Sequence, residues 1–93
     1  MSGSSTVLFN PAAAWSLNAQ VSLRDEAFGA LAYHHGTRRL VFLKSPELVT
    51  LVRSLEHFDN ADLAIDAVVE PAQHARYVAA LSSLATSEIL RER

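Results

Sequence analysis

Polar and apolar residues alternate over residues 15–24, where every second residue is apolar. Alternation with a period of two over this length predicts one or two half-buried β-strands. A second apolar run with aromatic character covers residues 28–34, and a third run covers residues 38–43. Residues 35–37 separate these two runs, so we expect a β-hairpin in which Gly36 supplies the positive φ of a tight turn.

The apolar period changes to that of a helix after Ser45. Ser45, Pro46 and Glu47 form a helix start, with an N-cap serine, a proline at the first helical position and an acidic side chain at the positive end of the helix dipole. The apolar residues that follow have the spacing of one helix face and are Leu48, Leu51, Val52 and Leu55.

Two further helices are expected beyond this first one. Asp59 or Asn60 can cap a shorter second helix, and Glu70 with Pro71 ends it and starts a third. The third helix carries a broad apolar stripe and has room to continue to Leu90, followed by a solvated end over residues 91–93. The stripe consists of Tyr77, Val78, Leu81, Leu84 and Ala85.

Three strands followed by three helices predict an α+β domain with its helices on one face of a three-stranded antiparallel sheet. The same elements make up a winged-helix-like unit. We expect a single domain over residues 15–90, preceded by a flexible N-terminal segment over residues 1–14.

Composition narrows the class of protein. Apolar residues make up 49% of the chain and charged residues 19%, which suits one folded domain. The net charge of −2 argues against a dedicated DNA or RNA binder, because such domains usually have a surplus of basic residues. The first residues lack the pattern of a signal peptide, and no apolar run reaches the roughly 20 residues of a membrane span. A cytoplasmic protein without a membrane partner is therefore expected.

Candidate catalytic and metal-binding residues are few. The chain has no cysteine, which excludes disulfides, thiolate metal sites and a cysteine nucleophile. His34 and His35 are adjacent, so on a strand they point to opposite faces and cannot chelate one metal together. No serine lies in a glycine elbow, and the three glycines are too scattered for a phosphate-binding loop. We expect neither catalysis, nor a metal, nor a cofactor.

A basic cluster lies on the last predicted strand and consists of Arg38, Arg39 and Lys44. One interpretation is an exposed sheet edge that cationic side chains protect against aggregation. The other is an edge that pairs with an incoming extended peptide, whose acidic residues the arginines would attract. The apolar stripe of the third helix also has two interpretations. It is either part of the core or one wall of a groove beside the edge strand. Composition and spacing do not separate these alternatives.

The segment over residues 33–40, Tyr-His-His-Gly-Thr-Arg-Arg-Leu, with Lys-Ser-Pro-Glu-Leu over residues 44–48, resembles the MftB family of mycofactocin biosynthesis chaperones. This family is one of the PqqD-like proteins, and the resemblance extends over about residues 15–84. It implies a RiPP recognition element, a peptide-binding module that holds the leader of a ribosomally made precursor peptide as an added strand. The implied partners are an MftA-like precursor and an MftC-like radical S-adenosylmethionine (SAM) enzyme, to which the iron–sulfur clusters and SAM would belong.

The resemblance places the peptide on the last strand and against the third helix, residues 73–84. We expect the backbone of the strand to pair with the peptide, with the side chains of Arg39, Val41 and Leu43 on one face. A free edge could also pair two copies of the chain in a homodimer. The alternative to a peptide-binding function is that of a winged-helix nucleic-acid-binding protein. The expected peptide-binding residues are Arg38, Arg39, Leu40, Val41, Phe42, Leu43, Arg76, Tyr77, Ala80 and Leu84.

Overall fold

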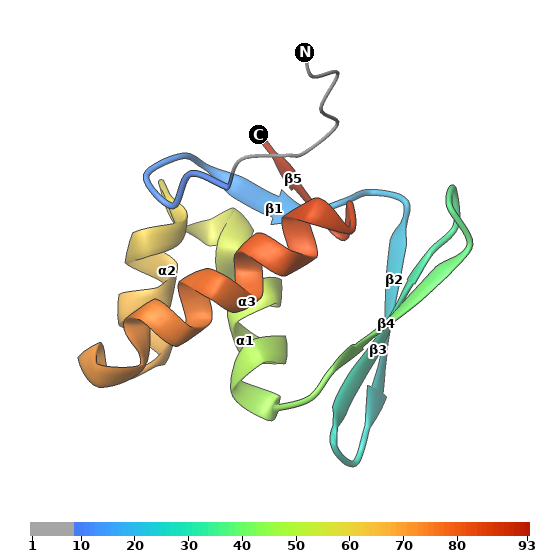
Figure 1. The fold of residues 1–93 in the computed structure, drawn as a ribbon, viewed down its shortest axis with the longest axis horizontal. Helices are drawn as coiled ribbons and strands as arrows, with labels where there is room; N and C mark the ends of the chain where they lie inside the picture. The colour runs from blue at the N-terminus through green and yellow to red at the C-terminus, as the bar shows by residue number, and fades with distance from the viewer. Residues whose placement is uncertain (1–8) are drawn as a thin grey trace.

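The computed structural model describes residues 9–93, in which the strands form two antiparallel sheets (Figure 1). The strands are β1 (Trp15–Leu17), β2 (Val21–Glu26), β3 (Gly29–His34), β4 (Arg39–Leu43) and β5 (Leu90–Glu92). The larger sheet has the strand order β2-β3-β4, and the smaller sheet pairs β1 with β5.

Three α-helices and two short 3₁₀ helices follow β4. They are α1 (Pro46–Ser54), η1 (Leu55–His57), α2 (Ala61–Val68), η2 (Pro71–Gln73) and α3 (His74–Thr86). The predicted α+β fold, a three-stranded antiparallel sheet followed by three helices, is confirmed. Both predicted helix caps are also present: Ser45 accepts from the backbone N–H of Leu48 at 3.1 Å, and Asn60 accepts from that of Leu63 at 2.8 Å.

The hydrophobic core lies between the helices and one face of the larger sheet. Ala30 and Ala32 of β3 are fully buried, and their small side chains allow α1 to pack against the sheet. In Figure 1 the larger sheet lies at one side of the helices, so its other face has no helix over it. The largest fully buried side chains are Trp15, Leu43, Leu51, Leu55, Ile65, Leu81 and Ile89.

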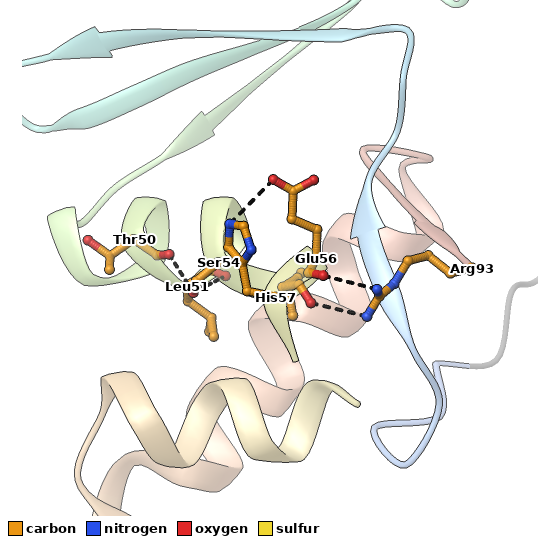
Figure 2. A network of polar contacts seen from close by, with 7 residues as sticks. Thr50, Leu51, Ser54, Glu56, His57 and Arg93 are labelled. Atoms are coloured by element: carbon orange, nitrogen blue, oxygen red, sulfur yellow. Dashed lines mark hydrogen bonds and ion pairs between the residues drawn. The ribbon is translucent and has the colours of Figure 1, made fainter. Parts of the chain in front are cut away.

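The C-terminal end differs from the prediction. The third helix ends at Thr86 and does not continue to Leu90, because Glu88 takes a left-handed φ of 64° and turns the chain back. Leu90–Glu92 then pairs with β1, with Leu90 opposite Leu17. Arg93 is not a loose end: it donates to the carbonyl oxygens of Leu55, Glu56 and Phe58, and Figure 2 shows it reaching the 3₁₀ turn after α1.

The turn between β3 and β4 also differs from the prediction. The positive φ belongs to Arg38, at 61°, and not to Gly36. Gly36 is needed for space instead, because a Cβ there would lie 2.2 Å from Oε1 of Gln20 and 2.9 Å from Cε1 of His34. The hairpin itself is confirmed, with His34 opposite Arg39.

The expected flexible segment, residues 1–14, lies largely outside the described residues. Its described part contacts the domain: Pro11 and Ala13 accept hydrogen bonds from the first backbone N–H groups of α2, and Ala14 accepts one from Arg93. Trp15 is buried, and its indole N–H donates to the carbonyl of Asn10 at 2.8 Å.

The longest helix within residues 9–93 is α3, with 13 residues, and no helix there has the length and apolar character that a membrane crossing requires.

Candidate functional site

The strand β4 forms one edge of the larger sheet. It pairs with β3 on one side, and within residues 9–93 no strand pairs with its other side. Alternate residues of an antiparallel strand bond to a given neighbour, so about half of the backbone N–H and C=O groups of β4 point toward this free side. The free side can therefore accept a further strand through main-chain hydrogen bonds.

The side chains of β4 divide between the two faces of the sheet. Leu43 is fully buried and Val41 half-buried on the face toward the helices, and Arg39 lies exposed at the start of the same face. Leu40 and Phe42 point to the opposite face and are 57% and 56% exposed. A strand added to β4 would therefore contact different side chains on its two faces.

A cleft of about 170 Å³ lies where β4 ends. The start of α1 and one side of α3 form its walls, and its residues are Lys44, Ser45, Leu48, Arg76, Tyr77 and Ala80. Three of the four residues expected on the helix thus lie together beside the end of β4. The fourth, Leu84, is in the core with 4% of its side chain exposed.

A second, wider cleft adjoins the first. It has a volume of about 480 Å³, and Arg76 and Tyr77 line both clefts. Its other walls come from α1 and from the end of α2, through Glu47, Val68, Val69, Glu70 and Gln73. The two clefts together form a groove, which we call the α3 groove, that begins at the free end of β4 and follows α3 away from the sheet.

The charge at the β4 edge is positive. Arg39 is the first residue of β4, and Arg38 and Lys44 flank the strand. None of the three has an ion-pair partner among residues 9–93. Arg38 and Arg39 are exposed, as their position at the hairpin end of β4 requires. An uncompensated cation at each end of the strand favours an acidic ligand over a basic one.

The adjacent histidines have structural roles in the hairpin. His34 is buried, and its Nδ1 accepts hydrogen bonds from the backbone N–H groups of Gly36 at 3.0 Å and Thr37 at 3.1 Å. His35 is exposed on the other face, where its Nε2 lies 2.7 Å from the hydroxyl of Ser22. Across residues 9–93, no three His, Asp or Glu side chains are grouped so that they could hold a metal ion.

Sequence reasoning missed three residues of the first cleft, Lys44, Ser45 and Leu48, and the walls that α1 and the end of α2 give to the second cleft. The sequence did contain a signal for the nearness of β4 and α1. The N-cap at Ser45 leads the chain directly from β4 into α1 and so brings the end of the strand beside the start of α1. Their meeting with α3 depends on helix packing and has no local pattern.

Comparison with known proteins gives one family. The profile described as the Peptide chaperone MftB family matches residues 14–91. The chain is 48% identical to a protein of Mycobacterium ulcerans (strain Agy99) named Peptide chaperone MftB, over 88% of this chain and 76% of that protein. It is 44% identical to the protein of that name in Mycolicibacterium smegmatis, over 90% of this chain and 83% of the relative.

A third relative, from Mycobacterium tuberculosis, has the same name and is 41% identical over 88% of this chain and 76% of its own length. The role in these names is not catalytic, in agreement with the prediction that this chain is not an enzyme. No solved structure matches the chain.

Proposed function

This chain belongs to the peptide chaperone MftB family, and from that premise we propose that it binds the leader of a ribosomally made precursor peptide along β4 and presents it to a radical SAM enzyme in mycofactocin biosynthesis. The precursor is MftA-like and the enzyme MftC-like, as the resemblance of the segment around the hairpin implies. The iron–sulfur clusters and SAM belong to the enzyme.

The free edge of β4 with its unpaired cations carries this proposal. Main-chain groups on that edge can pair with any extended peptide, so the edge alone provides affinity without selectivity. Arg38, Arg39 and Lys44 add the selectivity, because charge-assisted hydrogen bonds to carboxylates are stronger than neutral ones. We expect a leader with acidic residues on both sides of a short apolar stretch.

The α3 groove supports a longer contact than the strand provides alone. A peptide that pairs along the whole of β4 leaves the strand at Lys44, which lines the first cleft. There the ring of Tyr77 and the small side chain of Ala80 would contact the continuing peptide, and Arg76 adds a cation. The domain over residues 15–90 then acts as a RiPP recognition element with a strand site and a groove site.

Self-pairing through the same edge is the competing use of β4. In an antiparallel dimer centred on Val41, Arg38 would lie opposite Lys44 of the second copy, twice in the interface. Like charges directly opposite each other destabilise a strand pair. A homodimer through the edge is therefore expected only at high protein concentration and without peptide.

The test is a titration of the ¹⁵N-labelled chain with a leader peptide of the MftA-like precursor, followed by amide NMR shifts. We expect the largest shifts on residues 39–44 and 76–80, because these amides line the added strand and the α3 groove. A peptide with the same composition in scrambled order is the control for unspecific charge attraction.

Shifts confined to β2, or equal shifts with the scrambled peptide, would exclude strand addition on β4. Binding of duplex DNA with a steep salt dependence, in place of the peptide, would favour the nucleic-acid-binding alternative.

A further inference from the structure

The face of the larger sheet that points away from the helices is apolar along β3 and β4 and polar along β2. Along β3 and β4, side chains alternate between the two faces, and the outward positions hold Leu31, Tyr33, Leu40 and Phe42. The strand register places Leu31 opposite Phe42 and Tyr33 opposite Leu40, so these four side chains lie together. A sheet face that meets water normally carries polar residues at these positions.

The turn before β3 adds Phe28 to this surface. Its ring lies edge to face with that of Phe42, with centroids 5.9 Å apart. We call the five side chains the outer patch: Phe28, Leu31, Tyr33, Leu40 and Phe42. Four large apolar side chains are strongly exposed in the described part of the chain, and three of them, at 41% to 57% exposure, belong to the outer patch. Contiguous exposed apolar side chains of this kind mark an interaction surface.

The outer patch is continuous with the β4 edge. Leu40 and Phe42 belong to both, because they lie on the edge strand and point outward. A peptide strand added to β4 would direct every second side chain to the same outer face, next to Leu40 and Phe42. The occupied sheet therefore presents a wider apolar surface than the empty one.

Charges at the border of the outer patch indicate what it would bind. Arg24 borders the patch but is already paired with Glu26 at 2.7 Å. Lys44 lines the hollow next to Phe28 and Phe42 and has no ion-pair partner among residues 9–93. The unbalanced charge at this border is thus positive, which suits an apolar partner surface with acidic residues at its rim.

We propose that the outer patch, widened by the bound peptide strand, is the docking surface for the enzyme that modifies the peptide. This inference rests on the proposed function and adds the surface on which the enzyme would meet the chaperone. In this arrangement the β4 edge and the α3 groove hold the peptide, and the outer face of the sheet is free to contact the enzyme. The enzyme would then bind the loaded chaperone more tightly than the empty one, because part of the surface comes from the peptide.

The test uses Phe28→Glu, which places an acidic group in the outer patch outside β4. Its matched control is Leu63→Glu, because Leu63 is similarly exposed, at 47%, but lies on α2. Affinity for fluorescent leader peptide is measured first, and then affinity of the loaded chain for the purified radical SAM enzyme. We expect all variants to bind the peptide within twofold of the unaltered chain. Phe28→Glu should weaken binding of the enzyme at least tenfold, and Leu63→Glu should leave it unchanged.

A third variant, Phe28→Lys, tests the charge of the partner, and we expect it to weaken enzyme binding less than Phe28→Glu does. Unchanged enzyme binding in Phe28→Glu, or equal loss in Leu63→Glu, would overturn the docking proposal while leaving peptide binding intact. So would a dimer of the unaltered chain, seen by sedimentation, that Phe28→Glu dissociates, because the patch would then belong to a second copy. Failure of the unaltered chain to bind the peptide would instead refute the proposed function.

Discussion

The two edges of the larger sheet, β2 and β4, differ in how their charges are used. On β2, Arg24 pairs with Glu26 at 2.7 Å, and Asp25 pairs with Arg53 of α1 at 2.9 Å. On β4, Arg38, Arg39 and Lys44 have no such partners among residues 9–93. Both strands pair with β3 in a continuous register, so the difference is in the side chains and not in the backbone.

The comparison shows that charged side chains on an edge strand do not always prevent a further strand from pairing with it. Charges on an edge strand discourage pairing with another copy of the same strand. Where each charge has a partner within the chain, as on β2, little net charge remains to attract a ligand. Where the charges are unpaired and of one sign, as on β4, we expect the edge to disfavour its own copy and to favour a strand of opposite charge.

The β2 edge also has a hollow beside it, as the β4 edge has. It has a volume of about 420 Å³ and is lined by β1 and the turn after it, by β2, and by the end of α1 with Glu56. The β2 edge is thus a second candidate for the peptide, and variants matched across the sheet distinguish it from the β4 edge.

The largest expected effect is on the stability of the β4 edge and comes from Gly29→Ala. Gly29 has a φ of 150°, and a Cβ there would lie 2.1 Å from the carbonyl oxygen of Leu43 at the end of β4. Backbone strain and overpacking each cost about 1–3 kcal/mol, so we expect a loss of about 3 kcal/mol in the free energy of unfolding. Urea denaturation measures it.

The matched control for that variant is Gly36→Ala. A Cβ there would lie 2.2 Å from Oε1 of Gln20, at the end of a flexible side chain, and 2.9 Å from Cε1 of the buried His34, but the φ of Gly36 is not positive. We expect a loss below about 1.5 kcal/mol, the lower part of the range for overpacking. Equal losses in the two variants would mean that the contact between Gly29 and β4 is not tight.

Proline substitutions give the next largest effect and compare the edges directly. Val41 and Phe42 are adjacent on β4, so the N–H of one bonds to β3 and that of the other faces the free side. Val41→Pro and Phe42→Pro each remove one N–H, and the variant whose N–H faced the free side should keep the melting temperature of the unaltered chain. That variant should bind the leader peptide about tenfold more weakly. Calorimetry provides the dissociation constants.

Leu23 and Arg24 of β2 lie at the same levels of the sheet, opposite Ala32 and Leu31, and provide the controls. Proline at the tolerated one of these two positions should leave peptide affinity unchanged. A loss of affinity there, with none on β4, would move the peptide to the β2 edge.

Charge reversal gives the smallest effect. Arg39→Glu should weaken binding of an acidic leader about fivefold at low salt, because exposed ion pairs contribute up to about 1 kcal/mol each. Arg24→Glu on β2 should leave the affinity unchanged. Fluorescence anisotropy at several salt concentrations checks both, and the difference between the variants should shrink as salt rises. Equal affinities at every salt concentration would remove the charges of β4 from the recognition.

Most of the fold could be predicted from the sequence, because its signals are local. The caps expected at Ser45 and at Asp59 or Asn60 indicated the starts of α1 and α2. Alternation over residues 15–24 and the two apolar runs after it predicted the strands of the larger sheet. The strand Leu90–Glu92 could not be predicted, because three residues hold no periodic pattern and its partner is Trp15–Leu17, at the other end of the chain. The prediction that Gly36 has the positive φ was also wrong. The turn covers the four residues 35–38, and its last residue, Arg38, has the positive φ.

The candidate site could be predicted in part. Alternation showed that neighbours on β4 point to opposite faces, but only packing decides that Leu43 is buried while Leu40 and Phe42 are exposed. The cleft beside Lys44 depends on the angle at which α3 crosses the start of α1, which no local pattern encodes. The peptide-binding residues themselves stay a prediction until the titration is done.

The pairing of β1 with β5 bears on the order in which the domain can fold. The strands of the larger sheet follow one another closely along the chain, and hairpins between such neighbours form with little loop-closure entropy. The β1–β5 pair joins residues 15–17 to residues 90–92, so nearly the whole chain must be looped before it forms. We therefore expect the hairpin that contains β4, the edge that would receive the peptide, to form early in folding. The β1–β5 pair at the two ends of the domain should form after it.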